Sequence, residues 1–394
     1  MSIEIQNRVE DQSIGFEAPL QGLLVIDVSD QRGAYAGRVL GDLGAKVIKV
    51  QGWRETRQGS IDSSSSDFDA RGVFNDLSKV IMRCDDSDDQ LFQMDQLLKD
   101  ADIVITDLMP NQLKLMELDQ LVDRFPHLIH LSVSPWGLSG PGADQPATDL
   151  TILAAGGLLG LAGEPLEPPV RPYAEQSSIA ASLHGVVGAL ISLLARDGWS
   201  SSSGVGHGQL VDVSAQEAIA CALENAAQYV DLQGLIRHRT GAEPSEAGSG
   251  LFKCADGFVY LVAGIGGVPL AWDGLIAWIG NSGSLDLSTQ FSADRWRDRE
   301  WRRTSEATNE FRLAFESFAS EQGKVQLCEG GQAAGVSISP VSTPADLFEQ
   351  AQLVYREFFR EIVCPGGLTV TVPGAPYRFD GIDIGPRPTV EIDE

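Results

Sequence analysis

The chain has 394 residues and a formal net charge of −26, which comes from 55 acidic side chains against 29 Lys and Arg. Such an acidic surface repels phosphate backbones on average, so nucleic acid is excluded as a partner. The length suits two lobes with separate cores, and the hydrophobic fraction of 43% is that of a folded globule.

The first predicted elements form a βαβ unit. Residues 1–20 are a polar leader with acidic side chains and no apolar run, unlike a secretory signal. Residues 22–29 are a continuous apolar run, which is typical of a strand buried on both faces. Residues 34–43 have helical apolar spacing and end at Gly44, and residues 46–50 are a second short strand. This order of elements indicates a parallel sheet.

The same pattern recurs downstream, so we expect one large domain over residues 21–235. Further strands are predicted at 101–106, 128–133 and 209–214. Helical spacing is predicted over 111–125, 149–196 and 215–235. Because no stretch of about 18 uninterrupted apolar residues occurs, we expect a cytoplasmic protein with no membrane segment.

A smaller domain is predicted after a linker. The linker is predicted over residues 236–250, because its second half contains several Gly and Ser residues, as flexible linkers do. The small domain is expected over residues 251–335 and opens with a strand at 257–263. Its four tryptophans are expected to be core or interface anchors, namely Trp272, Trp278, Trp296 and Trp301. Residues 336–394 are β-like in part, and we expect them to return to the large domain.

Several short motifs follow one another along nearly the whole chain. They are Tyr35-Ala-Gly37, Leu43 to Val50 (LGAKVIKV), Ala101 to Pro110 (ADIVITDLMP), Ser132 to Pro141 (SVSPWGLSGP), Thr148-Asp-Leu150 and Gly206 to Ser214 (GHGQLVDVS). In this order they resemble the motifs of family III CoA transferases, the CaiB/BaiF family. Members of that family include formyl-CoA transferase, carnitine CoA-transferase and α-methylacyl-CoA racemase.

The resemblance implies both a fold and a reaction. The fold is α/β, with a large Rossmann-like domain formed by both chain ends and a smaller inserted α+β domain. Two chains interlock as rings in the family's dimers, so a homodimer is implied. The reaction moves CoA from an acyl-CoA to a carboxylic acid acceptor, and it implies no permanently bound cofactor.

The resemblance places the catalytic residue at Glu175. The family's nucleophilic aspartate follows an alanine, and the matching segment here, Pro168 to Glu175, reads PPVRPYAE. A carboxylate of either length can attack an acyl thioester and pass through a mixed anhydride to an enzyme-bound glutamyl thioester. The extra methylene displaces the nucleophile, and a misplacement of roughly 1 Å can cost about 10²-fold in rate, so neighbouring residues must be adjusted. The alternative is that Glu175 is an ordinary acidic residue at a helix N-terminus.

Basic residues near the start of the chain are candidates for binding the phosphates of CoA. Arg54, Arg57 and Lys79 lie where the family has basic residues near the nucleotide, and Lys49 is a further, less certain candidate. The guanidinium fork of arginine suits phosphate because it can donate two parallel hydrogen bonds. The alternative for each of these residues is a solvated surface charge.

The turn at the start of the first helix is also expected to contact CoA. It includes Arg32 and Ala34, and its backbone N–H groups should face an anion. Asp107 falls in the same region by its motif but replaces the family's asparagine. A carboxylate beside a phosphate is unfavourable. The loop around Asp107 is therefore expected to bind CoA differently from the corresponding loop of the family.

Two other functions remain open. An α-methylacyl-CoA racemase needs a histidine where this chain has Thr148, and a threonine hydroxyl cannot act as a base near neutral pH. The second is a non-catalytic CoA-binding paralogue, paired with an active subunit. It is supported by the departures at Asp107, Met109 and Gln51.

Histidines and cysteines do not suggest a metal site. The five cysteines form no CxxC pair, and His127, His130, His207 and His238 show no metal-binding spacing. His184 lies among small residues of a predicted helix, so we expect it to be a packed core residue.

Overall fold

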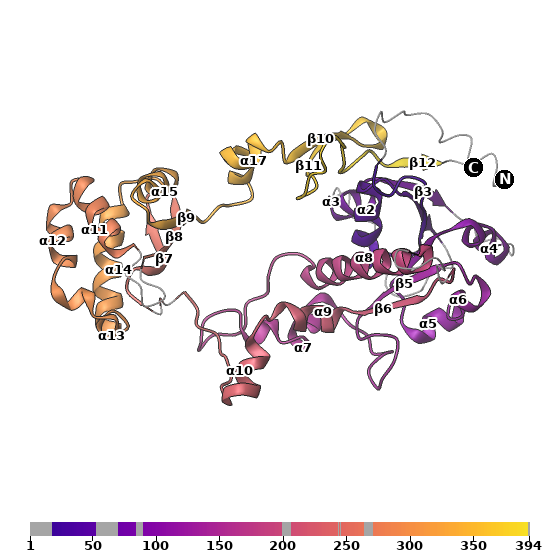
Figure 1. Cartoon of the computed structure of the whole chain (residues 1–394), viewed down its shortest axis with the longest axis horizontal. Helices are drawn as coiled ribbons and strands as arrows, with labels where there is room; N and C mark the ends of the chain where they lie inside the picture. Colours follow the sequence, from indigo (N-terminus) through magenta and orange to yellow (C-terminus); the bar gives the residue numbers. More distant parts are fainter. Residues whose placement is uncertain are drawn as a thin grey trace. The chain divides into compact units, whose positions relative to one another are not determined.

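The computed structural model describes residues 18–52, 70–83, 90–198, 206–242, 244, 246–263 and 271–392. Contacts between residues divide the chain into two compact units (Figure 1). The large unit comprises Met1–Leu161, Arg171–Arg237 and Ala351–Glu394, and the small unit comprises Ala162–Val170 and His238–Gln350.

The large unit is built on a parallel sheet of seven strands, in the order β12-β3-β2-β1-β4-β5-β6. The strands are β1(Leu24–Asp27), β2(Lys46–Gln51), β3(Lys79–Arg83), β4(Ile103–Thr106), β5(Ile129–Ser134), β6(Leu210–Ser214) and β12(Val390–Ile392). Strands β4 and β5 are buried at every residue, and their side chains are apolar or small apart from His130. Since β12 pairs with β3, the C-terminal segment joins the N-terminal strands in one sheet.

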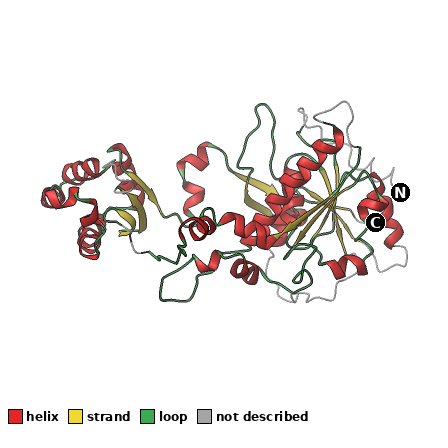
Figure 2. Cartoon of the chain, turned by 60° about the horizontal axis from the view of Figure 1, so that its bottom comes forward, coloured by secondary structure: helices red, strands yellow, loops and turns green. Residues whose placement is uncertain are grey.

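Helices cover both faces of this sheet (Figure 2). Successive residues of β1 point to opposite faces, so Val25 packs with one group of helices and Ile26 with the other. The first group is α2(Ala34–Asp42), α7(Asp149–Ala155), α8(Gln176–Asp197) and α9(Ala215–Ala222). The second group is α4(Gln90–Asp100), α5(Pro110–Leu115) and α6(Leu121–Arg124). The parallel α/β unit predicted from the sequence is therefore present.

Helix α8 packs closely on β5 and β6 through glycine. A Cβ atom at Gly188 would lie 2.7 Å from Val211 Cγ1, and one at Gly185 would lie 3.0 Å from Leu131 Cδ1. By length and composition alone α8 could cross a bilayer, but 44% of its most apolar stretch is buried inside the protein. Core helices of water-soluble proteins pass the same test, so α8 is weak evidence for a membrane segment.

All three stretches predicted with helical spacing are divided in the structure. Residues 111–125 form α5 and α6, residues 149–196 contain α7, a short 3-10 turn and most of α8, and residues 215–235 form α9 and α10(Ala226–Gln233). The last break falls at Leu223 to Asn225, where Glu224 adopts a φ of 55° that is incompatible with a right-handed helix. Apolar spacing continues across such a turn, so the pattern alone did not reveal it.

The remaining elements of the large unit are short. They are α3(Ala70–Asp76), η1(Leu158–Gly160), α17(Ala351–Tyr355), the antiparallel pair β10(Phe359–Val363) and β11(Thr369–Pro373), and η3(Pro365–Gly367).

The small unit packs helices on an antiparallel sheet of three strands, β7(Ser249–Cys254), β8(Gly257–Val262) and β9(Ser337–Pro340). Its helices are α11(Trp272–Asn281), α12(Leu285–Phe291), η2(Asp294–Arg297), α13(Arg299–Arg302), α14(Ser305–Ala319), α15(Lys324–Ala333) and α16(Asp346–Glu349). Trp272, Trp278 and Trp296 are buried in its core and Trp301 packs against that core, as predicted.

Candidate active site

The candidate site lies at the carboxyl ends of β1 and β4, which are neighbours at the centre of the sheet. The chain leaves β1 toward α2 on one face and leaves β4 toward α5 on the other face. In doubly wound sheets this divergence opens a crevice where ligands bind. Residues 28–33, after β1, and Asp107, after β4, form the two sides of this position.

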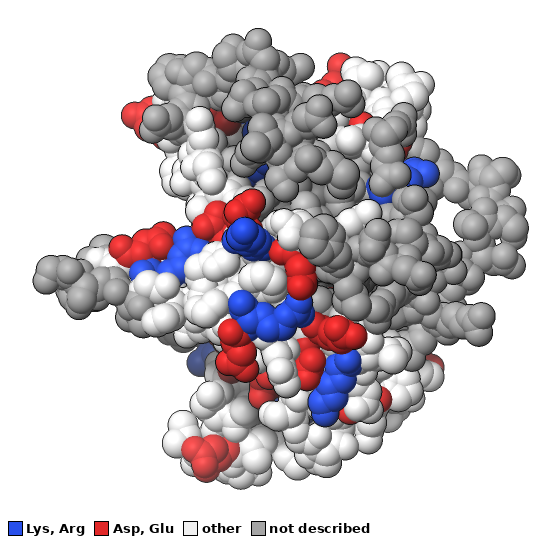
Figure 3. Space-filling model, turned by 90° about the vertical axis from the view of Figure 1, so that its right-hand side faces the viewer, with Lys and Arg blue, Asp and Glu red and all other residues white. Residues whose placement is uncertain are grey.

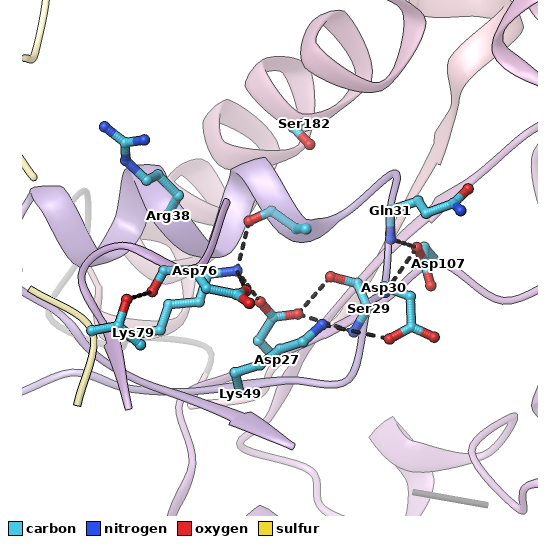
Figure 4. A network of polar contacts seen from close by, with 12 residues as sticks. Asp27, Ser29, Asp30, Gln31, Arg38, Lys49, Asp76, Lys79, Asp107 and Ser182 are labelled. Atoms are coloured by element: carbon cyan, nitrogen blue, oxygen red, sulfur yellow. Dashed lines mark hydrogen bonds and ion pairs between the residues drawn. The ribbon is translucent and has the colours of Figure 1, made fainter. Parts of the chain in front are cut away.

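The Asp107 carboxylate accepts hydrogen bonds from the backbone N–H groups at this position. Its Oδ2 atom accepts hydrogen bonds from the backbone N–H groups of Asp30, Gln31 and Arg32, at 3.1, 2.8 and 3.0 Å (Figure 4). The sequence predicted that N–H groups near Arg32 would face an external anion. In the structure the three N–H groups face an internal carboxylate, which is only 8% exposed.

Asp27 and Lys79 form a buried ion pair beside this loop. Lys79 Nζ lies 2.7 Å from Asp27 Oδ2 and 2.8 Å from the carbonyl oxygen of Ala34, and both charged side chains are fully buried (Figure 4). Burial alone would raise the pKa of Asp27, but the charges of Lys79 and Lys49, with hydrogen bonds from Lys79 and Ser29, hold that pKa below its ordinary value.

These contacts bear on two predicted CoA-binding residues. The ammonium of Lys79 is enclosed by protein and would have to leave Asp27 and Ala34 to reach a phosphate. Ala34 is itself buried, and its carbonyl group faces Lys79. Arg54 and Arg57 lie outside the described residues.

The position at the carboxyl ends of β1 and β4 carries more acid than base. Lys49 is buried, and its Nζ lies 3.7 Å from Asp30 Oδ1. Burial lowers the pKa of Lys49, but four carboxylates together raise it above its ordinary value, namely Asp27, Asp30, Asp107 and Asp76. A phosphate placed here would meet these carboxylates, so the expected repulsion beside Asp107 has a structural basis.

Glu175 lies at the N-terminus of α8, directly before Gln176. Its side chain makes no hydrogen bond that caps the helix. The first turn is capped by Asp149 of α7, whose Oδ1 accepts from Ser177 N at 2.9 Å and from Ser177 Oγ at 2.7 Å. Glu175 is therefore at a helix N-terminus, as the alternative interpretation requires, but the capping role belongs to another residue.

Arg71 of α3 forms an ion pair with Glu175. The Arg71 side chain is 46% exposed and the Glu175 side chain 25% exposed, so solvent reaches both side chains. Ala174, which precedes Glu175, has a φ of 61°, in the left-handed region that a non-glycine residue enters at some cost.

Hydrogen bonds join the Glu175 region to the β1–α2 loop. Ser182, two turns into α8, donates its hydroxyl to the carbonyl of Arg32 at 2.6 Å. The guanidinium of Arg32 donates to the carbonyl of Ala147, just before α7, at 2.8 Å. The predicted residues Arg32, Ala34, Lys79 and Asp107 thus lie in one hydrogen-bonded region, which these bonds connect to α7 and α8.

Sequence patterns did not assign roles to two residues of this region. Asp149 was part of the motif Thr148-Asp-Leu150, so its position in the motif was a signal that could have identified it. Arg71 had no such signal, because it belongs to no motif and contacts Glu175 from 104 residues away.

The histidine expected in the core is a different one. His184 lies on the exposed face of α8, so its predicted packing was wrong. The buried histidine is His130 of β5, whose Nε2 lies 2.9 Å from Thr106 Oγ1. Burial lowers the pKa of His130 to about 4, so this side chain is neutral near pH 7. Among the described residues, no cluster of three or more His, Cys, Asp or Glu side chains could hold a metal ion.

Described charges of both signs lie side by side on one face of the molecule. On the face drawn in Figure 3, Lys and Arg side chains are interspersed with Asp and Glu and do not gather in one basic patch. A polyanionic ligand would therefore depend on a few specific cations.

The chain is similar to known CoA transferases. The sequence model of CoA-transferase family III matches residues 20–390. The chain is 33% identical over 372 residues to the succinyl-CoA:(R)-benzylsuccinate CoA-transferase subunit BbsE of Thauera aromatica, covering 90% of this chain and 87% of that protein. It is 25% identical over 373 residues to the succinyl-CoA:glutarate CoA-transferase of Mus musculus, covering 92% and 80%. Its fold is similar to the crystal structure of a CaiB/BaiF family protein from Brucella suis, with a TM-score of 0.79, 24% identity and coverage of 95% and 97%.

Proposed function

The chain belongs to CoA-transferase family III, as its motifs predicted, and is a CoA transferase; we propose that it transfers CoA through a thioester on Glu175. The observation that carries this proposal is the placement of the Glu175 carboxylate. It precedes a long helix whose cap is supplied by Asp149, it is partly exposed, and it contacts Arg71. A carboxylate with no capping role is available for nucleophilic attack.

The proposed reaction has two halves that mirror each other. The Glu175 carboxylate attacks the acyl carbon of the donor, which forms a mixed anhydride and releases CoA as the thiolate. The thiolate then attacks the Glu175 carbonyl carbon, which gives the glutamyl-CoA thioester and frees the donor's acid as a carboxylate. An acceptor carboxylate repeats the two steps in reverse order and leaves as its CoA thioester, with Glu175 regenerated.

Succinyl-CoA is the proposed donor. The proteins from Thauera aromatica and Mus musculus are both named for succinyl-CoA, with different second acids. The second acid is therefore proposed only as a carboxylic acid. Arg54 and Arg57 are kept as proposed contacts for the CoA phosphates, because the described part of the crevice offers acid and enclosed lysines.

The structure offers no support for the racemase alternative. Thr148 is the N-cap of α7, where its hydroxyl oxygen accepts from the backbone N–H of Thr151 at 3.3 Å. A hydroxyl in this role caps a helix and supplies no base.

A non-catalytic subunit is the second candidate. The relative from Thauera aromatica is itself named as a subunit, and the family aspartate is a glutamate here. This candidate predicts CoA binding without covalent chemistry at Glu175.

We further propose a cytoplasmic homodimer. Four apolar side chains of α8 are exposed on one side of the helix in the single chain, namely Leu183, Val187, Ile191 and Leu194. Their spacing places them on one stripe, which suits burial against a second protein surface.

Trapping the thioester tests the function. The wild-type protein is incubated with succinyl-CoA and then with borohydride, and the peptide containing Glu175 is measured by mass spectrometry. We expect reduction of the Glu175 carbonyl to an alcohol, and no such product in Glu175→Gln. Transfer activity of Glu175→Gln should fall by at least about 10³-fold, because the nucleophile is gone.

Calorimetry separates catalysis from binding in the same variants. Glu175→Gln should bind CoA with affinity close to that of the wild type. Glu175→Asp should retain the thioester but react about 10²-fold more slowly if the site is adjusted to the longer side chain. A wild-type protein that binds CoA but yields no reduced Glu175 would favour the non-catalytic subunit.

A further inference from the structure

Asp149 binds the hydrogen-bond donors that the residue before a helix ordinarily binds with its own side chain. Glu175 stands at that position of α8, because its carbonyl oxygen accepts the first helical hydrogen bond, from Ile179 N at 3.2 Å. The side chain of such a residue usually accepts from the backbone N–H two or three positions further along the chain. In α8 the first of these N–H groups belongs to Ser177, and its bond goes to Asp149 instead.

The carboxylate of Asp149 is directed entirely at Ser177. Its Oδ1 atom accepts from Ser177 N at 2.9 Å and from Ser177 Oγ at 2.7 Å, whereas its Oδ2 atom is buried with no hydrogen-bond partner among the described residues. Asp149 is also the first residue of α7, so its negative charge lies near the positive ends of two helices. These contacts fix the start of α8 to the start of α7.

The backbone of Glu175 is not that of a residue that caps its own helix. Capping residues typically have an extended backbone, whereas Glu175 has a φ of −101° and a ψ of 72° and follows Ala174, whose φ is 61°. The Glu175 side chain pairs with Arg71 of α3 and makes no capping bond. Its carboxylate could bind the Ser177 donors only by leaving this conformation.

We propose that Asp149 is a positioning residue, which keeps the Glu175 carboxylate available for attack by capping α8 in its place. The inference rests on the proposed function, because this availability matters to the reaction only if Glu175 is the nucleophile. Without Asp149, two donors of the buried Ser177 would lack an acceptor, which is unfavourable. The Glu175 carboxylate would then turn toward them, and its displacement would slow the attack on the acyl carbon.

The length of the side chain at position 175 fits this division of roles. Aspartate is one of the preferred capping residues, and glutamate is not among them. Glu175 therefore competes less strongly with Asp149 for the Ser177 N–H than an aspartate at the same position would.

The rate of CoA loading tests the role of Asp149. The protein is mixed with succinyl-CoA and quenched in acid at short times, and the fraction of chain that carries CoA is measured by intact mass. For Asp149→Ala we expect the maximal loading rate to fall by about 10²-fold, as for a nucleophile misplaced by roughly 1 Å. The half-saturating succinyl-CoA concentration should stay close to that of the wild type.

Two variants separate positioning from a general loss of stability. Asp149→Asn keeps an acceptor oxygen for Ser177 and breaks no other hydrogen bond of the described residues, so it should restore most of the loading rate. Thr304→Ala removes a helix cap in the small unit, where Thr304 Oγ1 accepts from Ala307 N at 3.2 Å. It should lower the thermal unfolding midpoint, as Asp149→Ala does, and leave the loading rate unchanged.

A double variant shows whether residue 175 takes over the cap, with a measurement that needs no reaction. Glu175→Asp places a preferred capping side chain directly before α8. It should therefore raise the thermal unfolding midpoint more in Asp149→Ala than in the wild type, where Asp149 already binds Ser177. If Asp149→Ala alone does not fold, cooperative unfolding of the double variant gives the same evidence.

The outcomes distinguish this inference from the proposed function. A wild-type protein that loads no CoA on Glu175 overturns both. Normal wild-type loading with an unchanged maximal rate in Asp149→Ala overturns only the role of Asp149. Loading as slow in Asp149→Asn as in Asp149→Ala also overturns it, because the charge and not the cap would then matter. An equal effect of Glu175→Asp with and without Asp149, or a double variant that stays unfolded, does the same.

Discussion

Asp107 shows how one side chain can occupy backbone donors that would otherwise be open to a ligand. Three converging N–H groups form a site that would suit a phosphate oxygen, and Asp107 supplies an oxygen from the protein itself. The sequence predicted that Asp107 would disfavour phosphate. It could not predict the cause, because the three donors lie more than 70 residues earlier in the chain.

His130 gives a prediction about pH. Its pKa is lowered from 6.5 to about 4 in the folded protein, so between these values the unfolded chain binds the proton and the folded chain does not. Stability should therefore fall as pH falls through this window. Between pH 7 and pH 5 the loss from this group should be about 2 kcal/mol, measured as the free energy of unfolding in urea.

Two variants isolate that contribution. His130→Asn removes the titrating group and keeps an amide that can reach Thr106. Between pH 7 and pH 5 its free energy of unfolding should therefore change by about 2 kcal/mol less than that of the wild type. His207→Gln, at an exposed position outside α8, should retain the wild-type dependence. Equal pH dependence in wild type and His130→Asn would show that His130 is not kept neutral by burial.

At the scale of single elements, the strands were easier to predict than the helices. Strands β1, β2, β4 and β5 each contain consecutive apolar residues, because burial on both faces favours apolar side chains at successive positions. Strand β3 was missed because Lys79 and Arg83 stand at its ends. Lys79 is buried there only because Asp27, on β1, neutralises it, and a contact between distant residues leaves no local pattern.

Helix α2 illustrates why one position in a motif must be glycine. A Cβ atom at Gly37 would lie 2.5 Å from Asp27 Oδ2 and 3.2 Å from Lys79 Cε. Since that carboxylate is fixed by Lys79, it cannot move without breaking the buried pair. Gly37→Ala should therefore lower the free energy of unfolding by about 2 kcal/mol, although alanine favours a helix by about 1 kcal/mol.

Gly160→Ala is the matched control for Gly37→Ala. No atom lies within 4 Å of the Cβ that it would add, so its effect on the free energy of unfolding should be within about 0.5 kcal/mol. If both alanine variants unfolded at the same urea concentration as the wild type, the close approach of α2 to Asp27 would be refuted.

For the molecule as a whole, the order of the strands could be anticipated more readily than the site. Repeated βαβ units and short connections restrict a chain to few topologies, and the doubly wound order is one of them. The site depends on side chains from α3, α7, α8 and two loops. Glu175 was predicted from the motif that surrounds it, whereas Arg71 and Asp149 come close to it or to its helix only through tertiary contacts.

The homodimer is a prediction for the whole molecule. The α8 stripe of Leu183, Val187, Ile191 and Leu194 should be covered in solution, because its exposure to water costs free energy along the length of a helix. Light scattering at micromolar concentration should give twice the 42.3 kDa mass of the chain. Because folding is linked to assembly in an interlocked pair, the unfolding midpoint should rise with protein concentration.

Charge placed on the stripe tests whether α8 contributes to the interface. Val187→Glu with Ile191→Glu should lower the fraction of dimer or abolish it, since two charges would be buried without partners. Leu313→Glu, at an exposed apolar position of α14 in the small unit, is the control and should stay dimeric. A wild-type monomer that unfolds cooperatively, with a midpoint independent of concentration, would rule out the interlocked dimer, because neither chain would then need the other to fold.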